Sequence, residues 1–224
     1  MEKRNKKLLA LGTFLIIFGV GVGTLPLLIS QVKEKSEDQR IEEFFNETSS
    51  EEKPAEDERA ENTISDDEET SDDIVSEENS ETGSTSNNSK YCMVLEIPKI
   101  KLQKGLYYKD SKYNSIKYNI QIMQESSMPD EEKGNLILSS HRGDSSISYF
   151  DKLSDLGNGD LVSVYYKNKK YNYQIVSSYL TAKDGTIDIL RDKEQTVLTM
   201  ITCVKNKKSK QVVYICNLVG TEDY

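Results

Sequence analysis

The stretch Leu161–Val176, with the sequence LVSVYYKNKKYNYQIV, decides the fold class. Two runs rich in β-branched and aromatic residues, 161–166 and 171–176, flank a polar segment at 167–170. Runs of this composition are typical of β-strands, and a short polar segment between two of them is typical of a hairpin turn. The stretch therefore predicts two antiparallel strands that are joined directly.

The same pattern recurs on both sides of this hairpin. Further short apolar runs bounded by turn-forming residues are Met93–Ile97, Gly134–Ser140, Thr196–Thr202 and Val212–Ile215. The span 149–156 instead carries apolar residues at helical spacing and predicts one short helix, whereas 113–124 fits a helix or a strand. Many short strands separated by turns favour an all-β barrel or sandwich.

Charge divides the 224-residue chain into three parts that sum to the net charge of −9. Residues 1–30 carry four bases and one acid, so +3; residues 31–90 carry 6 bases and 21 acids, so −15; residues 91–224 carry 19 bases and 16 acids, so +3. The composition excludes a collagen-like chain, a coiled coil and a multi-span membrane protein. Three cysteines are too few for a disulfide scaffold.

Residues 1–30 are expected to form a cytoplasmic tip and a transmembrane anchor. Leu8–Ser30 contains no charged residue, and its helical length of about 34 Å exceeds a hydrocarbon core of about 30 Å. Basic residues precede it and predict a cytoplasmic N-terminus, so the chain would be a single-pass protein of the cell membrane with its folded part extracellular. A cleaved signal peptide is the alternative, but the segment is longer than usual and no Ala-x-Ala follows it.

Residues 31–90 are expected to be a disordered acidic linker. The segment is rich in Glu, Asp, Ser, Thr and Asn, and only Ile41–Phe45 could form a short amphipathic turn. So few apolar residues do not bury enough surface to offset the conformational entropy of the chain. The remaining residues, 91–224, are enough for one folded domain.

Two candidate catalytic residues follow strands of this domain. His141, the single histidine of the chain, comes after an apolar run, and Cys203 ends another. A catalytic thiol needs a partner that helps it ionise and a donor that protonates the leaving group, and a histidine supplies both. The pair therefore predicts nucleophilic catalysis, although a lone Cys at a strand end is also common as a small core residue.

The sequence around these two residues resembles the sortases, which are membrane-anchored cysteine transpeptidases of Gram-positive bacteria. Thr199-Met200-Ile201-Thr202-Cys203 matches the family signature Thr-Leu-x-Thr-Cys, with Met200 in place of Leu, and a Ser-His-Arg strand end lies 62 residues earlier (203 − 141). The resemblance covers most of residues 91–219. Other matching segments are Leu95–Ile100, Gly134–His141, Tyr149–Leu153 and Gly159–Val162.

The resemblance implies a closed sortase-like β-barrel of about eight strands with one or two short helices, preceded by the anchor and the linker. It implies that Cys203 attacks the Thr–Gly bond of a C-terminal Leu-Pro-x-Thr-Gly-like sorting signal, with His141 as the acid and base. The acyl-thioester would pass to an amine of a cell-wall precursor or of another protein. Surface proteins that bear the signal are thus the expected partners. No cofactor, metal or nucleic acid is expected.

One feature departs from the family. Sortases carry an arginine on the strand after the cysteine, and the corresponding stretch here, 205–214, contains none. The family position falls near Lys210 or Gln211, and Arg142, next to the histidine, is a third candidate for the missing charge. A lysine keeps the charge but loses the planar fork of the guanidinium. A catalytically weak module that binds sorting signals or partners is therefore the alternative function.

The sequence leaves several points open. Cys92 and Cys216 either form a disulfide, which would leave Cys203 as the single free thiol, or are both reduced and buried. The acidic triplet 130–132 forms a solvated turn rather than a calcium site. A papain-like protease is disfavoured, because the histidine precedes the cysteine and the domain is small and rich in strands. The sortase subclass, the exact signal and the acceptor are not fixed.

Overall fold

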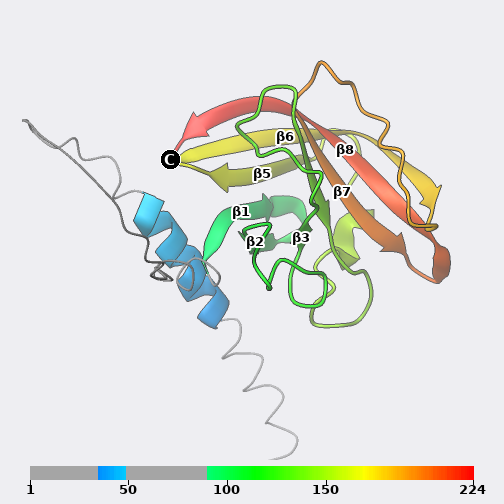
Figure 1. Ribbon diagram of the computed structural model, residues 1–224, viewed down its shortest axis with the longest axis horizontal. Helices are drawn as coiled ribbons and strands as arrows, with labels where there is room; N and C mark the ends of the chain where they lie inside the picture. The colour runs from blue at the N-terminus through cyan, green and yellow to red at the C-terminus, as the bar shows by residue number, and fades with distance from the viewer. Residues whose placement is uncertain (1–34, 49–89) are drawn as a thin grey trace, which may run out of the picture.

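The computed structural model describes residues 35–48 and 90–224, and its main feature is a single eight-stranded sheet (Figure 1). The strands are β1 Tyr91–Ile97, β2 Leu102–Tyr107, β3 Gln121–Ile122, β4 Asn135–Ser139, β5 Leu161–Tyr166, β6 Lys169–Ala182, β7 Val197–Val204 and β8 Lys207–Asp223. Two 3-10 helices, η2 Pro98–Ile100 and η3 Asp151–Asp155, lie between them. The order in the sheet is β2-β1-β5-β6-β8-β7-β4-β3.

The sheet curls into a nearly closed barrel, so the all-β class and the barrel are confirmed. Its two edge strands, β2 and β3, approach each other, and buried asparagines stand in for strand pairing there. The amide of Asn119 donates to the carbonyl of Gly105 on β2 over 2.7 Å, and that of Asn114 donates to the carbonyl of Ile122 on β3 over 2.9 Å. The short helix expected within 149–156 is η3.

The predicted hairpin is β5–β6, and it is tighter than the sequence suggested. Only Lys167 and Asn168 form the turn, with φ of 48° and 57°. Two consecutive residues with positive φ match the turn type whose twist fits antiparallel strands. β6 continues to Ala182 and pairs with β8 along its whole length, with two register shifts that allow so long a pair to bend around the barrel.

Strand β7 is buried on both faces, which explains its continuous apolar run. Leu198 and Met200 point into the core cluster of the barrel. Val197 and Ile201 point the other way and form a second cluster with Val213 and Ile215 of β8, against which Ile187 and Ile189 of the β6–β7 loop pack. The loop 183–196 therefore covers the outer face of β7.

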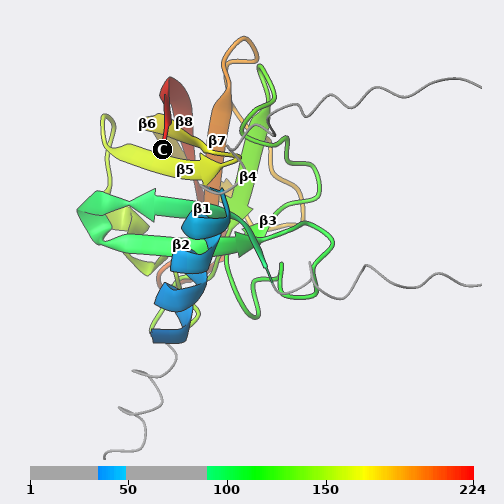
Figure 2. The same ribbon diagram turned by 90° about the vertical axis from the view of Figure 1, so that its left-hand side faces the viewer.

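The segment 35–48 is a helix, which corrects the expectation that all of 31–90 is disordered. Ile41 and Phe44, on one face of the helix, are 5% and 8% exposed and pack against Tyr91, Val94 and Tyr107 of β1 and β2 (Figure 2). Few apolar residues suffice here because the barrel offers them an aromatic surface. Residues 49–89 and the anchor predicted at 8–30 lie outside the described residues. Within those that are described, no helix is long and apolar enough to cross a membrane.

A buried ion pair fixes this helix to the barrel. The Glu37 carboxylate contacts the ammonium of Lys104 at 2.5 Å and accepts a hydrogen bond of 2.8 Å from the hydroxyl of Tyr91. The side chain of Lys104 is only 8% exposed. Burial, with the negative charge of Glu37 beside it, raises the pKa of Tyr91, so this hydroxyl remains a donor.

Replacing Glu37 tests the docking of the helix. We expect Glu37→Gln to lower the free energy of unfolding by about 3 kcal/mol, because it leaves the buried Lys104 ammonium without its carboxylate. Urea denaturation followed by circular dichroism measures the loss. Glu43→Gln, at an exposed position of the same helix, is the matched control and should change little. Equal losses in the two variants would contradict the assigned role of Glu37.

Tyr173 makes a second prediction. The residue is fully buried on β6, its hydroxyl has no hydrogen-bond partner within the described part of the chain, and burial raises its pKa. A raised pKa in the folded state gives a stabilisation that is complete below the unfolded value of about 10 and is lost as the pH rises above it. Tyr173→Phe should therefore be as stable as the unmodified protein at pH 7, or more stable by about 1 kcal/mol. Its stability should also fall less steeply between pH 10 and 11. A loss above about 2 kcal/mol at pH 7 would show that the hydroxyl is bonded.

Candidate active site

The only parallel strand pair in the sheet brings the two predicted catalytic positions together. β4 pairs with β7 in a register that runs from Asn135 opposite Val197 to Ser139 opposite Ile201, an offset of 62 residues (201 − 139). The same offset separates His141 from Cys203 (203 − 141). Since parallel strands end at the same edge of a sheet, His141 follows β4 where Cys203 lies near the end of β7.

Two hydrogen bonds continue this pairing beyond the last strand pair. The backbone N–H of Ser140 donates to the carbonyl of Ile201 over 3.3 Å. The hydroxyl of Thr202, which is 2% exposed, donates to the carbonyl of Ser140 over 3.0 Å. The residues immediately before His141 and Cys203 are thus bonded to each other. His141 is further held by its carbonyl, which accepts a bond of 3.2 Å from the N–H of Phe150.

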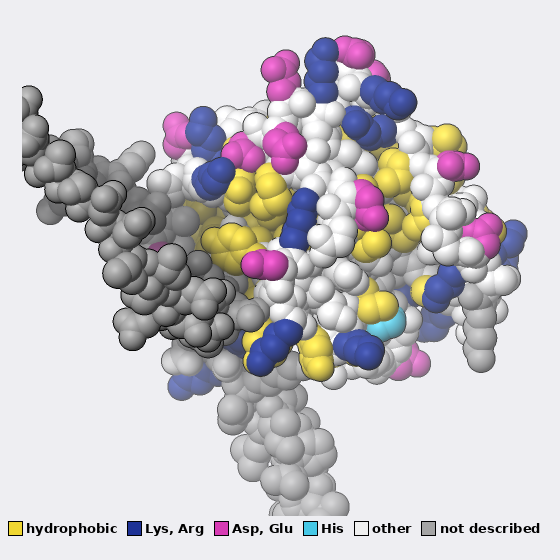
Figure 3. Space-filling model, in the orientation of Figure 1, with side chains coloured by type: hydrophobic (Ala, Val, Ile, Leu, Met, Phe, Trp, Pro, Cys, Tyr) yellow, Lys and Arg dark blue, Asp and Glu magenta, His cyan; other side chains and the backbone are white. Residues whose placement is uncertain are grey.

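Cys203 is the accessible thiol of the domain. It is half-buried, whereas Cys92 on β1 and Cys216 on β8 are buried; all three are free, so no disulfide joins the last two. Burial raises the pKa of Cys92 to about 12 and that of Cys216 further still, so both remain protonated near neutral pH. The single histidine is visible at the molecular surface, in cyan, in Figure 3, and His141 is half-buried.

None of the three positions considered for the family arginine places a cation against Cys203. Gln211 lies directly opposite Cys203 in the β7–β8 ladder, but it is 8% exposed and its amide donates to the carbonyl of Ala182 over 3.1 Å. Lys210, the neighbouring residue, is exposed and pairs with Ala182 of β6. Arg142 donates from Nη2 to the hydroxyl of Ser154 on η3 over 2.8 Å.

Arg191, the other arginine of the barrel, belongs to the opposite end of these strands. Its Nη1 donates to the carbonyls of Lys133 and Gln195 over 3.1 and 3.2 Å. Those residues precede β4 and β7, about 20 Å along the strands from Cys203 at roughly 3.3 Å per residue. Arg191 therefore fastens the β6–β7 loop to the start of the pair.

Sequence reasoning missed one residue at this site. The ammonium of Lys183, which directly follows β6, contacts the sulfur of Cys203 over 3.3 Å. Lys183 lies 20 residues before Cys203 (203 − 183), in a loop whose path the sequence does not specify. The one available signal was the pairing of long strands on both sides of β8, which the short apolar run 212–215 did not reveal.

The acidic triplet at 130–132 makes protein contacts. Asp130 pairs with Lys167 at 2.9 Å, and Glu131 accepts a hydrogen bond of 2.6 Å from the N–H of Met128. Among residues 35–48 and 90–224, no group of three or more His, Cys, Asp or Glu side chains is arranged to hold a metal ion.

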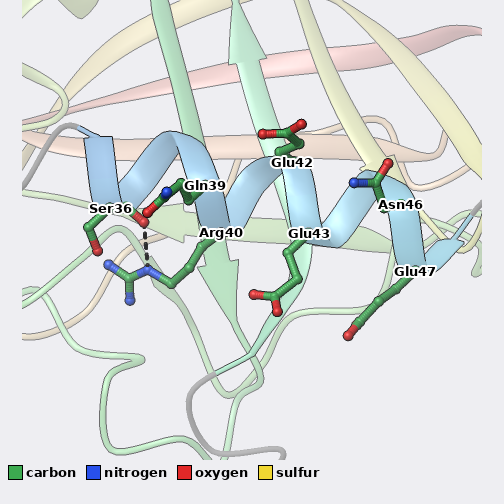
Figure 4. Close-up of a pocket in the computed structure, with 7 residues that line it drawn as sticks. All are labelled: Ser36, Gln39, Arg40, Glu42, Glu43, Asn46 and Glu47. Carbon is green, nitrogen blue, oxygen red and sulfur yellow. Dashed lines mark hydrogen bonds between the residues drawn. The ribbon is translucent and has the colours of Figure 1, made fainter.

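A shallow recess of about 680 Å³ lies elsewhere, along the outer face of the helix at 35–48 (Figure 4). Its lining is polar and mostly acidic, and Arg40, the one base in it, bonds to the carbonyl of Ser36 at 3.2 Å and to the hydroxyl of Tyr107 at 2.9 Å. The helix and the end of β7 lie on opposite sides of the barrel (Figure 1), so this recess is separate from the His141–Cys203 pair.

Comparisons with known proteins agree with this fold and these positions. The sortase domain model matches residues 95–219, so the chain belongs to the sortase family, whose members are cysteine transpeptidases. Sortase D of Bacillus subtilis (strain 168) is 30% identical over 155 residues, which are 60% of this chain and 64% of that protein. The match thus spans less than two thirds of that relative.

Solved sortase structures show the same fold. A Clostridium perfringens Sortase D5 transpeptidase superposes with a TM-score of 0.50 and 22% identity, over 58% of this chain and 80% of that chain. Sortase A of Listeria monocytogenes gives a TM-score of 0.51 and 16% identity, over 60% and 90%. A lid mutant of Streptococcus agalactiae Sortase C1 gives 0.52 and 19%, over 59% and 71%. Neighbours with names from three subclasses leave the subclass of this chain open.

The hydroxyl of Thr202 tests the link between the two strand ends. Thr202→Val keeps the side-chain shape but leaves the carbonyl of Ser140 without its buried donor, so we expect a loss of about 1–3 kcal/mol in the free energy of unfolding. Thr202→Ser keeps the hydroxyl and is the matched control. Urea titration measures both. A serine variant that loses as much as the valine variant would assign the effect to the methyl group instead.

Proposed function

We propose that this protein is a sortase that cleaves a Leu-Pro-x-Thr-Gly-like sorting signal between Thr and Gly and transfers the new carboxyl end to an amine. The observation that carries the proposal is the parallel register of β4 and β7, which places His141 and Cys203 at equivalent positions of adjacent strand ends. Cys203 is also the one half-exposed thiol among the three, all of which lie in the described part of the chain.

The chemistry requires both residues. The sulfur of Cys203, as a thiolate, bonds to the carbonyl carbon of the threonine, and the carbonyl π electrons move to its oxygen. When these electrons return, the C–N bond to glycine breaks and the leaving nitrogen takes a proton from His141. The resulting thioester is then attacked by the acceptor amine, which returns a proton to His141 while Cys203 leaves as thiolate.

The acceptor is an amine of a cell-wall precursor or of another surface protein. An anchor at residues 8–30 would hold the enzyme in the cell membrane with its N-terminus in the cytoplasm. Substrates that pass through the same membrane would then meet an extracellular catalytic domain.

A binding module for sorting signals is the second candidate. It is favoured by Gln211, which lies where a charged partner of Cys203 would be expected on β8 and whose amide is engaged by Ala182. A module of this kind needs the groove but not the thiol, so the two candidates differ in whether a covalent intermediate forms.

Intact-mass spectrometry distinguishes them. The full chain in detergent micelles is incubated with a panel of Leu-Pro-x-Thr-Gly-like peptides, and we expect a mass increase equal to the peptide without its glycine-containing leaving part. Cys203→Ala should abolish the adduct, and His141→Ala should slow its formation by about 10²–10⁴-fold. An adduct that persists in Cys203→Ala would refute the assignment. Its absence with every peptide, in a folded protein, would favour the binding module.

A further inference from the structure

The proposed transpeptidase needs a positive charge near its nucleophile, because negative charge builds up first on sulfur and then on the substrate oxygen. Of the two arginines in the barrel, one donates to Ser154 and the other fastens the far end of the β6–β7 loop. The β8 residue opposite Cys203 is a glutamine that is engaged elsewhere. The charge therefore has to come from another element.

Lys183 is the cation that the described structure places against Cys203. Its Nζ lies 3.3 Å from the sulfur, within the range of an N–H···S hydrogen bond. Its backbone is also fixed, since its N–H donates to the carbonyl of Ser209 over 2.9 Å, next to the pairing of Ala182 with Lys210. The side chain thus starts from the ordered end of the β6–β8 ladder.

We infer that Lys183 is a catalytic residue of this protein and that it takes the place of the β8 arginine of other sortases. This inference rests on the proposed role of Cys203 as nucleophile. The charge is supplied by the strand on the other side of β8, so the functional group has moved by one strand in the sheet while its target has stayed the same.

The geometry assigns two successive tasks to one ammonium group. Before the reaction, Lys183 donates to the sulfur and favours the thiolate over the thiol. After the S–C bond forms, the negative charge lies on the carbonyl oxygen, two bonds from the sulfur. An ammonium carries three donors on a flexible stem, so it reaches that oxygen by a small movement. His141, and not Lys183, supplies the proton that leaves with the amine.

The other charged groups near this strand end do not duplicate Lys183. Lys205 pairs with Asp144 at 3.8 Å, and Asp184 accepts hydrogen bonds from the N–H and hydroxyl of Thr186. Lys210 is exposed on β8, and the remaining titratable group is His141. Lys183 itself is exposed, so solvent screens its charge until a bound peptide covers the site.

The first readout does not depend on any peptide. Alkylation of Cys203 by iodoacetamide is followed against pH in the full chain by intact mass, with Cys92 and Cys216 protected by burial. We expect the pH of half-maximal rate to rise by about one unit in Lys183→Met and to change little in Lys183→Arg. Lys193→Met, at an exposed position of the same loop, is the matched control and should behave as the unmodified protein.

The second readout is formation of the acyl adduct. Lys183→Met should slow it by about 10²–10³-fold, while Lys183→Arg, which keeps the charge, should remain within about tenfold. Lys210→Met tests the position at which the sequence first suggested the charge, and we expect it to leave the alkylation profile unchanged.

The two readouts separate the two hypotheses. If the unmodified protein gives no adduct but Lys183→Met still shifts the alkylation profile, the transpeptidase is refuted and the contact of Lys183 with the thiol stands. If Lys183→Met matches the unmodified protein in the alkylation profile, or if Lys210→Met produces the shift instead, the role of Lys183 is overturned.

Discussion

The pairing of β4 with β7 is the interaction on which the rest of the site depends. Every other pair in this sheet is antiparallel, and antiparallel neighbours end at opposite edges. Only a parallel pair brings two strand ends, and the residues that follow them, to one place. A slip of one residue would turn every side chain of β7 to the other face of the sheet. The register therefore has to be strongly specified.

Buried polar groups provide part of that specification. The hydroxyl of Thr199, which is fully buried, donates to the side-chain oxygen of Asn135 over 2.8 Å, at the start of the pair. At the other end, Thr202 donates to Ser140. An altered register would leave these groups buried without partners, at a cost that apolar contacts alone would not impose. The two threonines of the signature thus act on position as well as on packing.

Much of the barrel could be predicted from sequence, because its central strands carry strong local signals. The β5–β6 hairpin and the runs of β4 and β7 combine β-branched residues with clear turns. The edge strands β2 and β3 could not be found in this way, since LQKGLY is of mixed character and Gln121–Ile122 is too short to show any period. The helix at 35–48 was hidden for another reason: its apolar residues are few and become useful only against Tyr91 and Tyr107.

The site divides in the same way. His141 and Cys203 were recognisable because each lies at a strand end within a recurrent local motif. Lys183 was not, because its proximity to Cys203 depends on the full length of β6 and on its pairing with β8, which brings residue 183 beside residue 209. Contacts created by the stacking of three strands leave no signal in any one of them.

The position of Lys183 also depends on the loop that it begins. The loop 183–196 is held at its start by Ser209, in its middle by the hydroxyl of Tyr179, and at its end by Arg191. The Tyr179 hydroxyl both donates to the carbonyl of Asp188 over 2.8 Å and accepts from the N–H of Leu190 over 2.9 Å. With Ile187 and Ile189 packed on β7 and β8, the loop is part of the folded structure, not a free connection.

A cation delivered from such a loop differs from one on a strand. An arginine on β8 would be fixed by the ladder, whereas Lys183 combines a fixed backbone with a flexible four-carbon stem. The fixed backbone keeps the ammonium near the sulfur, and the stem allows it to follow the negative charge from sulfur to oxygen. The planar, two-point contact of a guanidinium is lost, and the substrate must therefore be oriented by the groove between this loop and the end of β7. In this sortase, we infer, recognition of the signal depends more on the loop, and stabilisation of charge depends on its first residue.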